Sequence, residues 1–153
     1  MSSDANSFMA YAVQPVAPTG RGVVILPDIR GLHEYYCDLA ARFAEAGFST
    51  IAIDYFGRTA QTDDRTEAFE FRPHVDQSTP EGIAADTRAA VDYLRSGRGG
   101  EVVDIFTVGF CFGGGNSWRQ SADTPGLAGC IGFYGRVDGV LSVELDMQAP
   151  ILC

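Results

Sequence analysis

The sequence contains no lysine, only two histidines and no long uninterrupted apolar run. All 11 basic residues are arginines, they do not cluster, and the formal net charge is -9. A nucleic-acid-binding protein would normally carry a basic patch. No stretch reaches the length of a membrane-spanning helix, and the first residues lack the basic start and apolar centre of a signal peptide. We therefore expect a cytoplasmic protein that binds neither nucleic acid nor a membrane.

Cysteine is present but sparse, at positions Cys37, Cys111, Cys130 and Cys153. The spacing of the four matches neither a zinc-binding pattern nor a redox pair. Without a secretory signal, free thiols are expected rather than disulfides. All but Cys111 fit the usual role of a buried cysteine as a small apolar side chain. Nothing in the sequence calls for a metal or an organic cofactor.

Apolar runs alternate with helical patterns along the chain. A run without polar alternation is typical of a strand buried on both faces, and such runs occupy residues 22–29, 48–56, 102–110 and 127–135, with a fifth starting at 149–153. A weaker pattern over 7–15 predicts an edge strand, and amphipathic patterns over 34–47 and 78–97 predict helices. We therefore expect one domain over residues 1–153, of the α/β class: a three-layer α/β/α sandwich with a mainly parallel sheet.

One connection is unusually long and polar, over residues 57–79. Connections of this length are commonly lids or binding loops. It follows the C-terminal end of a predicted strand, which is the edge where α/β sheets bind ligands. We expect a lid or substrate loop here.

The stretch Gly109-Phe110-Cys111-Phe112-Gly113 joins a predicted strand to a helix-like segment. Serine hydrolases place a nucleophile on a sharp turn of this kind, with glycines two residues to either side. A cysteine there gains thiolate character from the helix N-terminus. The alternative is a structural cysteine among glycines that close packing requires. We favour a nucleophile.

Two backbone amides are candidates for an oxyanion hole beside this cysteine. The N–H of Phe112 follows the nucleophile directly, and the second donor is expected from the loop after an earlier strand. Ile29, at the end of the first predicted strand, is the natural supplier.

The segments "VVILPDIRGLHEYYCDLAARFAEAGFSTIAIDYFGR", "DTRAAVDYLRS", "VGFCFGGG" and "GCIGFYG" occur in this order. Together they resemble the dienelactone hydrolases, which are α/β-hydrolases with a Cys-His-Asp triad. The resemblance implies that Cys111 is the nucleophile, and that Phe112 and Ile29 supply the oxyanion hole. Asp28 stands where family members have a glutamate that contacts the resting thiol, although an ordinary loop carboxylate is the alternative.

The resemblance also implies an arginine that holds the carboxylate of a lactone substrate. Arg65 is the first candidate and Arg72 the second, because a guanidinium meets a carboxylate with two parallel hydrogen bonds. A solvated loop residue is the alternative in both cases. His33 follows the oxyanion loop and is expected at the mouth of the pocket.

A triad acid and base are missing from the expected places. No histidine follows Cys111, and His33 and His74 both precede it, where a loop or surface role is the simpler reading. The acidic residues after the nucleophile all precede the fifth strand, and none receives a triad role: Asp138, Glu144 and Asp146. The resemblance implies that the acid, the histidine, and the last strands and helix lie beyond Cys153. We therefore expect the N-terminal portion of a larger enzyme, inactive as this fragment alone.

The function expected from these features is hydrolysis of a small lactone or carboxylic ester, with or without a free carboxylate, through an acyl-cysteine intermediate. Two alternatives stay open. One is another esterase or a thioesterase on the same fold. The other is a catalytically dead module that retains a ligand pocket.

Overall fold

The computed structural model describes residues 2–60 and 62–153. Met1 and Gln61, which fall within the domain and loop predicted above, lie outside the described residues. Six strands form one sheet in the order β1-β3-β2-β4-β5-β6. They are β1 (Ala10–Val13), β2 (Arg21–Leu26), β3 (Ser49–Ile53), β4 (Asp104–Phe110), β5 (Gly129–Phe133) and β6 (Ile151–Leu152). Among these strands of the described residues, only β1 is antiparallel to its neighbour, which confirms a mainly parallel sheet with an N-terminal edge strand.

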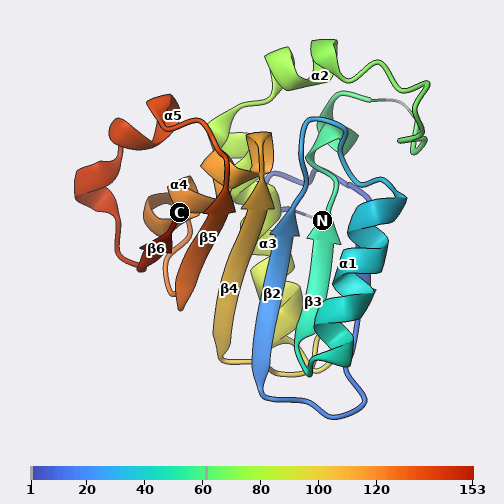
Figure 1. Cartoon of the computed structure of the whole chain (residues 1–153), viewed down its shortest axis with the longest axis vertical. Helices are drawn as coiled ribbons and strands as arrows, with labels where there is room; N and C mark the ends of the chain where they lie inside the picture. The colour runs from blue at the N-terminus through green and yellow to red at the C-terminus, as the bar shows by residue number, and fades with distance from the viewer. Residues whose placement is uncertain (1, 61) are drawn as a thin grey trace.

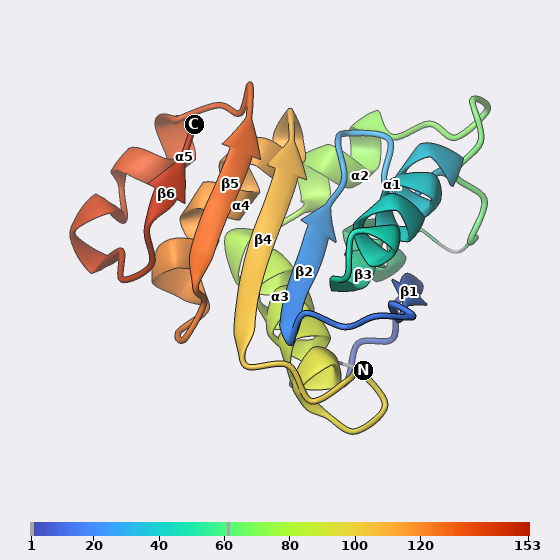
Figure 2. The ribbon, with the colours of Figure 1, turned by 60° about the horizontal axis from the view of Figure 1, so that its bottom comes forward.

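Helices cover both faces of the sheet (Figures 1 and 2). Helix α1 (Glu34–Glu45) lies on one face, and α3 (Pro80–Arg95) and α4 (Phe112–Asp123) lie on the other. Strand β2 shows why helices pack on both faces: successive side chains of a strand point to opposite sides of the sheet. Val23 and Ile25 pack with residues of α1, whereas Val24 and Leu26 pack with residues of α3. The predicted three-layer α/β/α arrangement is confirmed.

The two predicted helices are confirmed, and α1 and α3 end at Glu45 and Arg95, two residues before the glycines that mark their predicted ends. The Thr79 side chain accepts a hydrogen bond from the N–H of Gly82 at 3.1 Å, and Pro80 occupies the first position of α3. Gly47 follows Ala46, the C-cap of α1, and has a φ of 95°, a conformation that glycine adopts without strain. In the described part of the chain, no helix combines the length and apolarity needed to cross a membrane.

Four short helical elements lack the periodicity that would reveal them in sequence. They are η1 (Tyr55–Arg58), α2 (Arg72–Gln77), α5 (Asp138–Leu141) and η2 (Glu144–Asp146). Strand β3 ends earlier than predicted because residues 55–58 turn into η1. Helix α2 lies above the edge where the parallel strands end (Figure 1), and it belongs to the long connection over residues 57–79.

Candidate functional site

A strand, a sharp turn and a helix meet at Cys111. Strand β4 ends at Phe110 and α4 begins at Phe112, with Cys111 between them at φ 53° and ψ -114°. A positive φ is uncommon for any residue with a Cβ, and strained backbone of this kind clusters at functional sites. The Cys111 N–H donates a hydrogen bond to the carbonyl of Phe133 at 3.0 Å, which ties the turn to β5.

The glycines around this turn are required by the close approach of backbone to backbone. A Cβ on Gly109 would lie 1.9 Å from the carbonyl oxygen of Gly113. A Cβ on Gly113 would lie 2.1 Å from the carbonyl oxygen of Leu26 and 2.3 Å from that of Pro27. Helix α4 therefore starts directly against the loop that leaves β2, and only glycine permits this contact.

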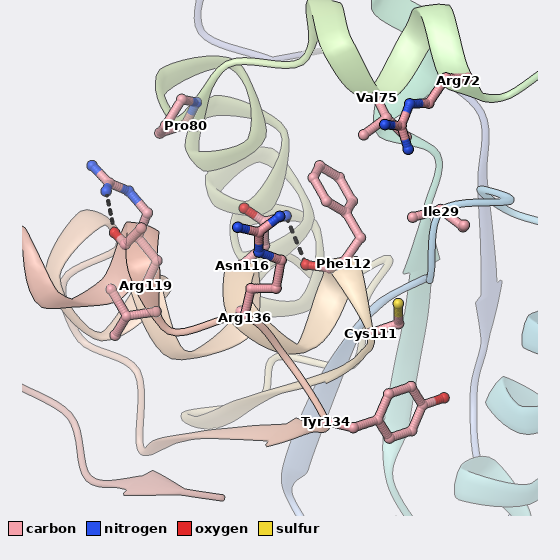
Figure 3. A pocket seen from close by; sticks show the side chains of 13 residues that line it. Ile29, Arg72, Val75, Pro80, Cys111, Phe112, Asn116, Arg119, Tyr134 and Arg136 are labelled. Atoms are coloured by element: carbon pink, nitrogen blue, oxygen red, sulfur yellow. Dashed lines mark hydrogen bonds between the residues drawn. The ribbon is translucent and has the colours of Figure 1, made fainter.

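A cavity of about 370 Å³ opens beside Cys111. Figure 3 shows the sulfur directed into it, on the side where Ile29 and Phe112 lie. One part of the lining is apolar and another is polar or cationic. The apolar side chains are those of Ile29, Val75, Pro80, Phe112 and Val140, and the polar or cationic ones are those of Arg72, Asn116, Arg119, Tyr134 and Arg136.

Both predicted oxyanion donors line this cavity. Ile29 follows β2, and Phe112 is the first residue of α4, so its N–H has no acceptor within the helix. Neither amide donates a hydrogen bond to any residue in the ranges 2–60 and 62–153. Two unused N–H groups beside a sulfur are what a developing oxyanion requires.

The charged groups lining the cavity, among the residues described, are all arginines. Arg72 and Arg136 are exposed and pair with Asp76 at 3.7 Å and Asp138 at 2.6 Å. Arg119 is less exposed and is held by Asp123 at 2.7 Å. Exposed ion pairs contribute little stability, so Arg72 and Arg136 are the two that can exchange their partners for a ligand.

Comparison with known proteins identifies the family of this chain. The sequence model described as "Dienelactone hydrolase family" matches residues 8–153.

The chain belongs to the dienelactone hydrolase family.

Similar proteins agree with this assignment. A Yersinia pestis protein named "Putative carboxymethylenebutenolidase" is 26% identical over 161 residues, covering 98% of this chain and 60% of that protein. A Bradyrhizobium protein named "Probable 2-oxo-3-(5-oxofuran-2-ylidene)propanoate lactonase" is 31% identical over 140 residues, covering 90% of this chain and 55% of that protein. The chain therefore spans little more than half the length of these relatives.

The fold has close counterparts among solved structures. A structure described as "Putative Dienelactone Hydrolase" from Klebsiella pneumoniae superposes with a TM-score of 0.69 at 22% identity, covering 95% of this chain and 71% of that chain. The α/β-hydrolase fold expected from the sequence is confirmed.

The structure does not bring Arg65, the first candidate for a carboxylate ligand, into the cavity of this dienelactone hydrolase family member. Its guanidinium is buried and paired with Asp54 through Nη2 at 2.7 Å and Nε at 3.2 Å. Nη1 donates to the carbonyls of Thr62 and Asp64. The guanidinium carbon lies 4.3 Å from the centroid of the Phe69 ring. This placement argues against a substrate role, because the donors that would meet a carboxylate are already used.

Asp28 and His33 also lie outside the lining of the cavity. The Asp28 Oδ1 accepts a hydrogen bond from the N–H of Arg30 at 2.8 Å, so this carboxylate stabilises its own loop. His33 Nε2 is buried without a hydrogen-bond partner, 3.9 Å from Asp28 Oδ1. Burial lowers the pKa of His33. The predicted contact between Asp28 and the resting thiol stays a prediction that no contact in the structure supports.

A general base is not found among the described residues that line the cavity. His74 lies in α2, where its Nδ1 is 2.9 Å from the Thr59 hydroxyl and its ring stacks on Phe69. Asp138 pairs with Arg136 on the surface. The described residues also contain no group of three or more side chains arranged to hold a metal ion.

Sequence reasoning missed Arg136 and Tyr134, which follow β5 and line the cavity of this family member. The strand order could have indicated their position near Cys111. Strands β4 and β5 are parallel neighbours, with Phe110 opposite Phe133. The residues that follow β5 must therefore lie beside Cys111.

Proposed function

We propose that Cys111 is the nucleophile of a hydrolase that cleaves small carboxylic esters or lactones. The observation that carries this proposal is the position of Cys111, on a strained turn at a cavity that is also lined by two residues with unused amides. A cysteine held only for packing would need neither the cavity nor the free amides.

The chemistry follows from that position. The Cys111 sulfur attacks the carbonyl carbon, and the N–H groups of Ile29 and Phe112 stabilise the negative oxygen that forms. The tetrahedral intermediate collapses, the bond to the alcohol oxygen breaks, and that oxygen takes up the proton that the thiol has lost; the alcohol of an ester leaves, whereas that of a lactone stays on the acyl group. Water then attacks the thioester, which releases the acid and restores the thiol.

The second half of this reaction should be slow in the chain of 153 residues. General-base catalysis contributes about 10² to 10⁴ in rate, and neither described histidine lines the cavity. We propose that the protein acylates readily with an activated ester and that the thioester accumulates, so that turnover is low.

The experiment is acylation with p-nitrophenyl acetate, followed by intact-mass measurement and peptide mapping. The background should be a Cys153→Ser variant, because the exposed Cys153 thiol would otherwise react. We expect one acetyl group, located on Cys111, and none in a Cys111→Ala variant of that background. Cys37→Ala is the matched control and should retain the label. Acetylation of Cys37 or Cys130 in place of Cys111 would refute the proposal.

Substrate class is the finer part of the proposal. Arg72 lies in α2 and Arg136 in the connection after β5, and both line the cavity, so we propose that they bind an anionic group of the substrate. Burial of Arg65 against Asp54 instead favours the second candidate, a hydrolase of neutral esters or thioesters. Acylation rates for one pair of activated esters, with and without a carboxylate, separate the two. A preference for the charged ester that falls in Arg72→Ala or Arg136→Ala supports anion binding, and equal rates support the second candidate.

A further inference from the structure

Two buried tyrosines hold the backbone just before Ile29. Tyr36 of α1 and Tyr55 of η1 are each 1% exposed. The Asp28 N–H donates to the Tyr36 hydroxyl at 3.0 Å. The Tyr55 hydroxyl lies against two carbonyl oxygens, that of Pro27 and that of Asp28, the latter at 3.0 Å. Two side chains from separate elements therefore contact three consecutive backbone groups.

The geometry of the peptide bond transmits these contacts to the oxyanion donor. The carbonyl of Asp28 and the N–H of Ile29 belong to one planar trans peptide unit, so fixing the oxygen fixes the direction of the N–H. The preceding unit, between Pro27 and Asp28, is held at its oxygen by Tyr55 and at its N–H by Tyr36. Hydrogen bonding to the Asp28 carbonyl also polarises that amide, which strengthens the Ile29 N–H as a donor.

Tyr55 also reaches the other half of the oxyanion hole. Its ring packs edge-on against the ring of Phe112, with 5.5 Å between the centroids. One fully buried side chain therefore touches the residue that carries the second donor and the peptide unit that carries the first. Burial raises the pKa of Tyr55 well above its usual range, so the hydroxyl stays protonated and remains a donor at neutral pH.

We infer that Tyr55, assisted by Tyr36, is a positioning residue that holds the Ile29 amide in register with the Phe112 amide. The inference rests on the proposed function, because it assigns Tyr55 to the oxyanion hole of that reaction. Neither tyrosine lines the cavity, so both act through the backbone rather than on the substrate. Preorganised donors cost no rearrangement when negative charge develops.

The test compares two reactions of the same sulfur in Tyr55→Phe and Tyr36→Phe. Acylation by p-nitrophenyl acetate forms an oxyanion, whereas alkylation by iodoacetamide does not. Removing a whole oxyanion donor costs about 10² to 10³ in rate. Misdirecting one should cost less, and we expect acylation of Tyr55→Phe to fall about tenfold relative to alkylation. Tyr36→Phe should show a smaller fall of the same kind.

The matched control is Tyr93→Phe. Tyr93 is partly buried and packs against the core away from the cavity.

The ratio of the two rates separates this inference from simpler explanations. A purely structural role would lower the unfolding midpoint and change both reactions together, leaving the ratio unchanged. A ratio within twofold of wild type in Tyr55→Phe overturns the inference, and if that variant does not fold, the ratio in Tyr36→Phe decides. Failure of wild-type Cys111 to acylate, with alkylation intact, would instead refute the proposed function.

Discussion

At the scale of single residues, the site depends on positions where a side chain cannot fit. Gly113 is the clearest case, because its missing Cβ leaves room for the carbonyls of Leu26 and Pro27. Those carbonyls belong to the backbone that leads into the Ile29 amide. Gly113 thus determines how closely the nucleophile turn and the oxyanion loop approach each other, in addition to permitting the turn itself.

We predict that Gly113→Ala destabilises the fold by about 3 kcal/mol or more, because backbone carbonyls cannot move aside as flexible side chains do. Urea unfolding measures the change. Gly139→Ala is the matched control, since Gly139 lies in α5 and a Cβ there would meet nothing within 4 Å. That control should change the free energy of unfolding by less than about 1 kcal/mol. Similar midpoints for the two variants would contradict the packing argument.

At the scale of elements, the connection over residues 57–79 is held down by a buried ion pair. Asp54, directly after β3, is 0% exposed and Arg65 is 4% exposed. Phe69, Phe71 and Val75, later in the connection, pack against the core. Because α2 supplies Arg72 and Val75 to the cavity, the ion pair also fixes one wall of the site. The connection is thus anchored at Arg65, between β3 and α2.

We predict that Arg65→Met costs about 3–5 kcal/mol of stability, because it leaves the buried Asp54 carboxylate without a partner. Limited proteolysis should show new cleavage within residues 57–79. The double variant Arg65→Met with Asp54→Asn should recover part of the loss, since the unpaired charge is gone. Arg98→Met, at an exposed position, is the control and should change little. A double variant less stable than Arg65→Met would show that the charge itself is not the cause.

The elements differ in how far the sequence reveals them. The inner strands could be predicted because a buried parallel strand is apolar on both faces. Two helix termini could also be predicted, because the Thr79 side chain caps the start of α3 and Gly47 adopts a positive φ after α1. Helix α2 is too short for an apolar period and could not be predicted. The same holds for the pairing of Arg65 with Asp54, since nothing in an 11-residue separation shows that the intervening chain folds back. The sequence therefore predicts Arg65 as a substrate ligand from its position in the motif, whereas its partner in the structure, Asp54, is set by the tertiary path of the chain.

At the scale of the whole molecule, the response of stability to pH combines opposing effects. The net charge of -9 means that acidification towards the isoelectric point relieves self-repulsion. His33 acts in the opposite direction. Burial lowers its pKa below the ordinary value of 6.5, so the unfolded chain binds this proton more readily than the folded chain does. Stability from His33 is therefore present above about pH 6.5 and is lost as the pH falls through that value.

We predict that a His33→Gln variant loses less stability than wild type between about pH 7.5 and about pH 5.5. Gln is neutral across this window, and His33 makes no side-chain cap bond to α1 that the substitution would remove. Urea unfolding of both proteins at both pH values gives four free energies, and the difference of differences cancels the background of the other charges. A wild-type loss no larger than that of His33→Gln would mean that the buried ring accepts its proton without penalty, for example by closing the 3.9 Å gap to Asp28.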